Sequence, residues 1–569
     1  MSIEKQKNNV LRFEQKARFH YLKYQKLADR GNYIDALVAL RAAAAKDPEN
    51  TDYQMELAEL YTELCCFDES NYIFFSLIAK EKGDPGDCVF GLGCNFFGLR
   101  DADKARECFT RYLEEFPEGM YTYEAQDFLD LMEYEEAEAL EDDVPPGAYD
   151  IAEEGKDLLD QGEYEQAIQV LSTALQKYPD LLFIKNNLAL AYYCCGETEK
   201  SQELTREVLA VEPENLHATC NKILFENSLG PGESWEDCIA TLDRLVPEEL
   251  DEKVKLALTY CELMEDERAY RILQTVLEEM PYDARTLFLM GASAANTGRY
   301  AEAFDYFMDM IKIDPENTIA LYYKNLVQEV CDGKRESVRI LYAYQVPMEE
   351  IRRRMAFINA SLQKGTEELQ RLWREDEVFS SLLVWGLSLG ELSVKRAVLD
   401  IIGNFADKKA EGILRRYLLR RSEPDPAKND ALLALRRMGA SQPYIAYISG
   451  KITEIRVGMV EDAKTRLYPS SQKVLERIIE GADILNAREI MPFALEIFGR
   501  YISAQKHAPL MRNTNAWAAA ILYICLPRLS AGGEWTMERV AEAMEAKPES
   551  VKRCVALLRK VFPAKDEEK

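Results

Sequence analysis

The sequence predicts an all-α repeat protein, and three observations support that prediction. Alanine, leucine, glutamate, lysine and arginine dominate the composition, whereas runs rich in valine, isoleucine and threonine are nearly absent. Prolines recur at a constant interval of 34 residues, at Pro179, Pro213, Pro247, Pro281 and Pro315. Glycines keep the same phase, at Gly162, Gly196, Gly230 and Gly298. A constant period of this length predicts stacked helix pairs that form a solenoid.

One unit illustrates why each residue type stands where it does. Residues 284–317 read ARTLFLMGASAANTGRYAEAFDYFMDMIKIDPEN. Gly298 is expected to end the first helix, because glycine adopts a left-handed conformation without strain. Ala303 is small where the paired helix passes close, and Pro315 stops the second helix because it has no N–H to donate. In these features the unit resembles the tetratricopeptide repeat (TPR), which implies an α–α superhelix with a concave binding face.

Taken in order, residues 1–132 are expected to form a first array of about three repeats and a capping helix. Residues 133–147 contain EYEEAEALEDD and then Pro145-Pro146-Gly147. This stretch predicts either a linker between arrays or a solvated helix end, and both interpretations stay open. Residues 148–336 are expected to form a second array of five repeats and a solvating helix. In its third repeat Trp235 replaces a small residue, so the second helix is expected to start late or to shift outward.

The 34-residue period stops near residue 337, but helical patterns continue. Residues 337–457 are predicted to be helical throughout, including 441–448, and the stretch from 394 to 448 resembles HEAT-type helix pairs. Residues 458–569 are expected to form a compact helical domain. Its end, 536–546 and 548–561, resembles a helix-turn-helix, and the alanine-rich helix before it resembles the last helices of cyclin-box domains. Glu545 stands where that motif usually has its turn glycine.

Charge and cysteine content bound the class of protein. The net charge is −29, and the acidic residues are concentrated before residue 338. The 13 cysteines show no CxxC spacing, which favours a reducing compartment. The first residues lack the apolar core of a secretory signal, and no apolar run is long enough to span a membrane. A cytoplasmic protein without membrane contact is expected.

Motifs for catalysis are missing from the sequence. The three histidines, His20, His217 and His507, lie far apart, and neither HExxH nor a phosphate-binding glycine loop is present. We therefore expect no enzyme activity, no cofactor, no metal site and no small-molecule substrate.

The TPR resemblance assigns the second, fifth, ninth, twelfth and thirteenth positions of each repeat to the concave face. In the second array these positions predict a groove lined by Phe183, Asn186, Leu190, Tyr193, His217, Leu224, Asn227, Val254, Leu258, Phe288, Asn296 and Tyr322. The face is apolar and carries asparagines, but almost none of the cations with which some TPR relatives clamp a carboxylate. We therefore predict a non-catalytic scaffold that binds an apolar helix or an extended peptide. For each residue, packing against the next repeat stays an equal alternative.

A second hypothesis is a regulator in which the TPR groove senses a protein and the C-terminal helices touch nucleic acid. It depends on cations at Lys547, Lys552, Arg553, Arg559 and Lys560. The other interpretation is that these side chains face acidic residues or water.

Overall fold

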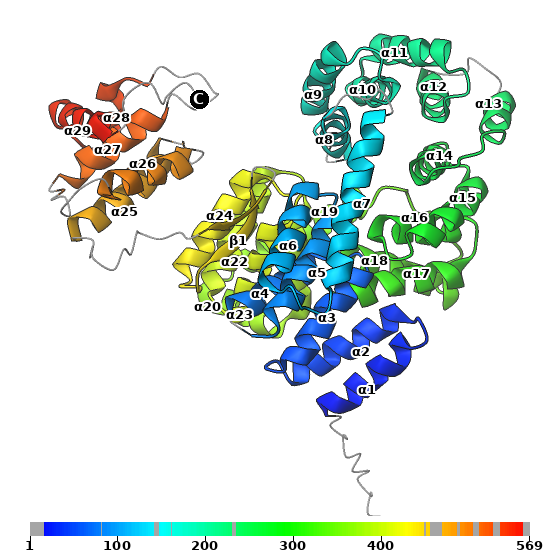
Figure 1. The fold of residues 1–569 in the computed structure, drawn as a ribbon, viewed down its shortest axis with the longest axis horizontal. Coiled ribbons are helices and arrows are strands. Elements are labelled where there is room, and N and C mark those ends of the chain that lie inside the picture. Colours follow the sequence, from blue (N-terminus) through cyan, green and yellow to red (C-terminus); the bar gives the residue numbers. More distant parts are fainter. Residues whose placement is uncertain are drawn as a thin grey trace, which may run out of the picture. The chain divides into compact units, whose positions relative to one another are not determined.

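The computed structural model describes residues 16–80, 82–141, 147–160, 162–229, 235–448, 451–455, 469–485, 487, 490–503, 511, 513–526 and 535–561. The chain divides into two compact units, Met1–Ala427 with Tyr447–Ile452, and Lys428–Ala446 with Thr453–Lys569. The predicted all-α class is confirmed, since α-helices make up nearly all of the regular structure in both units (Figure 1). Within these ranges no helix combines the length and the apolarity needed to cross a bilayer.

The first array forms the predicted helix pairs and ends in a long single helix. Its helices are α1 (Ala17–Ala28), α2 (Tyr33–Lys46), α3 (Thr51–Glu63), α4 (Phe67–Ala79), α5 (Pro85–Gly98), α6 (Ala102–Glu115) and α7 (Thr122–Glu141). Short polar residues begin several of them: the side chain of Asn50 accepts from the Tyr53 N–H, and that of Asp101 from the Lys104 N–H. Most of the acidic stretch after residue 132 is the end of helix α7. Pro145 and Pro146 lie outside the described residues.

The second array continues with the same pairing. Its helices are α8 (Ala148–Asp160), α9 (Tyr164–Lys177), α10 (Leu182–Cys194), α11 (Thr198–Val211), α12 (Leu216–Leu229), α13 (Trp235–Leu242), α14 (Leu250–Glu262), α15 (Asp266–Glu279), α16 (Ala284–Asn296), α17 (Tyr300–Ile313) and α18 (Thr318–Cys331). Helix α13 has 8 residues where α15 and α17 have 14, so the irregular third repeat does have a shortened second helix. Gly230 lies outside the described residues.

The turn positions behave alike in both arrays. Gly162, Gly196 and Gly298 have φ of 79°, 78° and 80°. Where the repeat lacks this glycine, a larger residue takes the same left-handed conformation, at Cys65, Arg100 and Met264. The turn between the two helices therefore requires a left-handed residue at this position, whether or not that residue is glycine.

The helices of one repeat approach closely at a second glycine. A Cβ atom on Gly291 would lie 2.7 Å from the Phe307 ring, and one on Gly93 would lie 2.6 Å from the Phe109 ring. Both rings are fully buried. The same contact thus packs the two helices of a repeat in each array.

The two arrays meet again at their far ends, where α2 lies beside α17 (Figure 1). The Arg41 guanidinium donates to the Ile313 carbonyl at 3.1 Å, and Lys312 pairs with Asp35 at 3.0 Å. The first array also contacts the region after the repeats, because Arg421 donates to the Leu99 carbonyl at 2.8 Å. The arrays are therefore joined by α7 and by these tertiary contacts.

The region after the repeats is helical except for one hairpin. It contains α19 (Met348–Leu362), α20 (Thr366–Glu375), α21 (Glu377–Trp385), a 3₁₀ turn (Gly386–Ser388), α22 (Leu392–Phe405), α23 (Lys408–Leu419), α24 (Asp425–Arg437), β1 (Tyr444–Ile448) and β2 (Lys451–Ile455). The predicted helix at 441–448 is wrong. Its end, Tyr-Ile-Ala-Tyr-Ile, is rich in aromatic and β-branched residues and forms strand β1 instead.

The remaining helices belong to the second unit, which contains α25 (Pro469–Ile484), α26 (Met491–Ser503), α27 (Thr514–Cys525), α28 (Met537–Ala543) and α29 (Pro548–Val561). Thr536 caps α28 through its hydroxyl, which accepts from the Arg539 N–H. Val540 and Val551 are fully buried between these helices, and Glu545 takes the left-handed turn conformation at φ 52°. The predicted helix pair is present, with a strained glutamate at its turn.

Candidate functional site

The second array curves so that its first helices face inward. In Figure 1, α8, α10, α12 and α14 lie on the inside of the curve, and α9, α11, α13 and α15 lie on the outside. Of the residues predicted for this face, Asn227 is exposed, nine are partly exposed, and Asn186 and Phe288 are buried. Phe288 lies in the core against Phe307 and Tyr323, so its assignment as a contact residue is wrong.

Amide side chains form a polar line across two of these helices, α10 and α12. The Asn186 Nδ2 group donates to Asn215 Oδ1 at 3.1 Å, and Asn221 Nδ2 donates to the Asn186 carbonyl at 3.2 Å. Asn215 Oδ1 also accepts from the Ala218 N–H, which fixes the orientation of both amides. Asn186 Oδ1 is consequently a buried acceptor that has no partner among the described residues.

Lys255 extends this line on α14. Its Nζ donates to Asn221 Oδ1 at 2.5 Å. Burial lowers the pKa of the Lys255 ammonium, and the nearby thiols of Cys220 and Cys194 only partly oppose that effect. No carboxylate in the described part of the chain pairs with this ammonium. A half-buried cation without a counter-charge favours an anionic or carbonyl oxygen of a ligand.

Aromatic residues form two stacked pairs along the same helices, and Phe225 is the buried member of one pair. Tyr193 stacks on Phe225 at 4.5 Å between centroids, and Tyr149 stacks on Phe183 at 5.0 Å. Leu190, Leu224, Val254 and Leu258 are partly exposed nearby in the same helices. The half of the face formed by α8 to α14 therefore offers apolar surface with a few oriented polar groups, as binding sites for peptides usually do.

His217 has a partner within the array. Its Nε2 lies 3.3 Å from Asp251 Oδ2. This contact lowers the pKa of the Asp251 carboxyl. His217 thus links α12 to α14. Across the described ranges, no three histidine, cysteine or acidic side chains gather as a metal site would require.

The other half of the face, along α16 and α18, is covered by a non-helical segment of the chain itself, residues 338–346, which bends at 342–345. Asn296 Nδ2 donates to the Ile340 carbonyl at 2.9 Å, and the Ile340 N–H donates to Asn296 Oδ1 at 2.8 Å. Ile340 is 1% exposed. The Tyr323 hydroxyl donates to the Gln345 carbonyl, and Tyr344 packs against Phe288. Asn296 therefore pairs with main-chain groups, and these groups belong to the same chain.

Two features of this face were missed by the sequence analysis. Lys255 follows Asn221 by 34 residues, so both occupy the sixth repeat position, which the predicted set of positions left out. The segment 338–346 lies after the periodic region and carries no repeat signal. Its apolar residues Ile340 and Val346, which are buried, were the available sign that this segment packs on the repeats.

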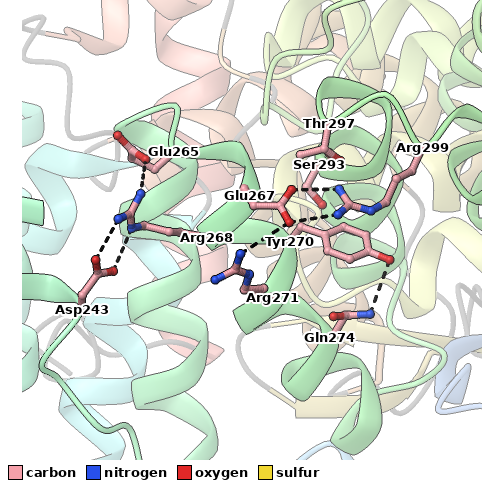
Figure 2. Close-up of polar contacts among 10 residues, drawn as sticks. All are labelled: Asp243, Glu265, Glu267, Arg268, Tyr270, Arg271, Gln274, Ser293, Thr297 and Arg299. Atoms are coloured by element: carbon pink, nitrogen blue, oxygen red, sulfur yellow. Dashed lines mark hydrogen bonds and ion pairs between the residues drawn. The ribbon is translucent and has the colours of Figure 1, made fainter.

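Ion pairs between repeats hold the helices that carry this face (Figure 2). Arg268 on α15 makes two 2.8 Å contacts with Asp243, and a third with Glu265. Arg299 binds both carboxylate oxygens of Glu267 and covers the Tyr270 ring at 4.3 Å. Bidentate pairs restrict the angle between neighbouring repeats, and they thereby fix the curvature of the concave face.

In the second unit, the cations predicted to meet nucleic acid are partly described. Lys547, Lys552, Arg553 and Arg559 are exposed, and the side chain of Lys560 lies outside the described residues. Lys552 and Arg559 are seven residues apart on α29 and share one face. Nucleic-acid contact stays a prediction.

Comparison with known proteins concerns the repeats. Models of the tetratricopeptide repeat match residues 87–119 and 155–181, and a second model of this repeat matches residues 284–317. The TPR repeat-containing protein YvcD of Bacillus subtilis (strain 168) is 26% identical over 304 residues, which cover 52% of this chain and 62% of that protein. The chain thus matches less than two thirds of its relative's length.

Similar solved structures include TTC0263, a thermophilic TPR protein of Thermus thermophilus, which is 17% identical in sequence. The match covers 32% of this chain and 98% of that chain, with a TM-score of 0.26. The TPR domain of P58(IPK) covers 56% of this chain and 99% of its own, with 17% identity and a TM-score of 0.23. The sequence period, the helix pairs and the matched repeat models agree in both arrays. Residues 87–119, 155–181 and 284–317 thus match tetratricopeptide repeats, and such repeats generally mediate protein–protein interactions.

Proposed function

We propose that the concave face of α8, α10, α12 and α14 binds an extended, mainly apolar segment of a protein partner, and that the chain acts as a non-catalytic scaffold. The observation that carries this proposal is the non-helical segment 338–346, whose main chain is bound on the neighbouring half of the same face. There, one asparagine side chain satisfies both main-chain groups of Ile340. A face built from the same repeats has the chemistry to hold a second segment.

The open half supplies the groups that such a segment needs. Asn227 is exposed and offers an amide donor and acceptor to a peptide main chain. Lys255 supplies an ammonium that lacks a counter-charge among the described residues, and the walls formed by Leu190, Leu224 and Leu258 accept apolar side chains. Asn186 is buried in the wall, so we assign it to positioning Asn215 and Asn221 and not to direct contact.

Site-specific photo-crosslinking tests this proposal. A photo-reactive phenylalanine analogue replaces Asn227 in the full chain, and, as a matched control, Gln169 on the outer helix α9. We expect a partner that crosslinks at Asn227 and not at Gln169, and we expect Lys255→Ala in the same chain to reduce its yield. Identical crosslinked proteins at both positions, or a yield insensitive to Lys255→Ala, would contradict the groove assignment.

A further inference from the structure

Helix α7 carries acidic charge alone. No lysine or arginine occurs between Arg111 and Lys156, so all the charged side chains of α7 are acidic. One face of the helix is packed: Ala125 and Met132 are buried, and the Phe128 ring stacks on Phe109 at 4.8 Å. This inner face holds α7 on the end of the first array.

The opposite face of α7 carries large apolar side chains that nothing in the described part of the first unit covers. Tyr123 is 85% exposed, Tyr134 64% and Leu131 43%. With Asp127 they follow at intervals of four, four and three residues, which places them on one side of the helix. We call these four residues the α7 stripe. Exposed apolar side chains gathered on one helix face mark an interaction surface more often than scattered ones do.

Acidic groups border the α7 stripe. Asp127 lies within it, and Glu124 and Asp130 lie beside it, all three exposed. No lysine or arginine of the described chain forms an ion pair with Glu124 or Asp127. The stripe therefore combines apolar anchors with uncompensated negative charge.

A cavity of about 550 Å³ adjoins the start of α7. It is lined by Asp84, Asp87 and Glu118 together with Phe116 and Met120, and none of its described lining residues is a lysine or arginine. Met120 lines this cavity, is 80% exposed and lies three residues before Tyr123 of the α7 stripe. Burial and the neighbouring Asp84 raise the pKa of the Asp87 carboxyl, so a cation placed here would relieve an unfavourable arrangement.

We propose that the α7 stripe and this cavity bind a basic amphipathic helix of a protein partner. Its apolar side chains pack on Tyr123, Leu131 and Tyr134, and its flanking lysine or arginine side chains pair with Glu124 and Asp127. One further cation enters the cavity between Asp87 and Glu118. Tyrosine rings add a favourable contact with guanidinium or ammonium groups.

Charge excludes the other occupants of such a surface. A second copy of the chain would bring the same acidic stripe against itself, and like charges in contact are unfavourable. An anionic membrane and a nucleic acid carry the same sign of charge as the stripe. This surface is also separate from the groove of the second array, whose exposed half is apolar and carries amides and one lysine.

The experiment measures calorimetric binding of a synthetic leucine–lysine peptide, patterned as an amphipathic helix, to the full chain. A scrambled peptide of the same composition serves as a probe for unspecific attraction to an acidic protein. At about 150 mM salt, where charges are screened beyond about 8 Å, we expect saturable one-to-one binding of the patterned peptide alone. In the variant Tyr123→Ser with Tyr134→Ser, which keeps every charge, the affinity should fall about tenfold or more.

Matched controls make each outcome decisive. Val211→Ser with Val246→Ser removes two exposed apolar side chains from the second array, and Asn227→Ala tests the other groove. Neither change should alter the affinity by more than about twofold, because both sites lie outside the α7 surface. Glu118→Gln should weaken binding and reduce its salt dependence. Equal binding of the scrambled peptide, or an unchanged affinity in the tyrosine variant, would overturn the proposal and leave the proposed groove untouched.

Discussion

The two arrays have the same repeat backbone and different inner surfaces. In the first array, the first helices of the repeats carry acidic and aromatic groups: the Tyr21 hydroxyl donates to Glu56 at 2.5 Å, and Phe90 on α5 stacks on Tyr121, just before α7, at 4.4 Å. In the second, the corresponding helices carry Asn221 and Lys255 among apolar side chains. The comparison teaches that the repeat fixes only the residues that pack its two helices. The residues at the other positions of the first helices are free to differ, and they differ between the two arrays.

The largest loss of stability is expected at the glycines that pack the two helices of a repeat, because both arrays share this contact. A valine at Gly93 or Gly291 would place its Cβ about 2.6–2.7 Å from a buried phenylalanine ring. We expect Gly93→Val and Gly291→Val each to lower the free energy of unfolding by about 3 kcal/mol, because neither helix can move away without opening the repeat. Chemical denaturation measures this. Gly390→Ala, at a position with no atom within 4 Å, is the control and should change little. A large loss in one array only would show that the shared packing is not equally important in both.

Two asparagines of the second array are expected to have different roles: Asn296 stabilises the fold, and Asn227 contacts the proposed partner. Asn296→Ala leaves the N–H and the carbonyl of Ile340 without their partner, so we expect a loss of about 2 kcal/mol. Segment 338–346 should also become sensitive to limited proteolysis. Asn227→Ala, at an exposed side chain, should change the stability by less than about 0.5 kcal/mol and affect only partner binding. Equal losses of stability in the two variants would refute this division.

These asparagines also show which parts of the site could be predicted from the sequence. Asn227 and Asn296 were both found from repeat phase, because the period places them on the inner helices. What separates them is segment 338–346, whose Ile340 lies 44 residues beyond Asn296. This segment lies outside the 34-residue period, so repeat phase does not predict its contacts. Strand β1 was missed because its five residues are too few to establish a pattern. The contact of Arg41 with Ile313 could not be predicted either, because it depends on how the whole array curves. Periodic packing was predictable, whereas tertiary contacts between distant segments were not.

The Glu69 carboxyl lies at the junction where the first array meets the end of α17. Burial, followed by the nearby carboxylates of Asp68 and Asp314, raises the pKa of Glu69 to about 7, and Arg420 only partly opposes this. Since the folded pKa lies above the ordinary value, protonation of Glu69 stabilises the fold fully below about pH 4.5. That contribution is lost as the pH rises to about 7.

The variant Glu69→Gln mimics the protonated side chain at every pH. Between about pH 5 and 7, the stability difference between variant and wild type should therefore grow in favour of the variant, by up to about 1 kcal/mol per pH unit. Melting temperatures measured across this range test the prediction. Glu203→Gln, which removes an exposed carboxyl of α11, should show no such trend. A constant difference between Glu69→Gln and wild type would mean that this carboxyl is ionised throughout the range.

The smallest change in stability is expected for substitutions in the turns between the two helices of a repeat. Here both arrays should change by similar amounts. Cys65 and Arg100 in the first array and Met264 in the second have φ of 55°, 56° and 57°, where side chains other than glycine are strained. Replacing each by glycine should raise the free energy of unfolding by about 0.5–1 kcal/mol, because relief of strain exceeds the greater freedom of glycine in the unfolded chain. The reverse change at the same repeat position, Gly196→Ala, should lower it by about 1 kcal/mol. Gains of the same size in both arrays would mean that one turn conformation serves two different binding surfaces. A gain confined to one array would mean that its curvature, and not the turn itself, imposes the left-handed residue.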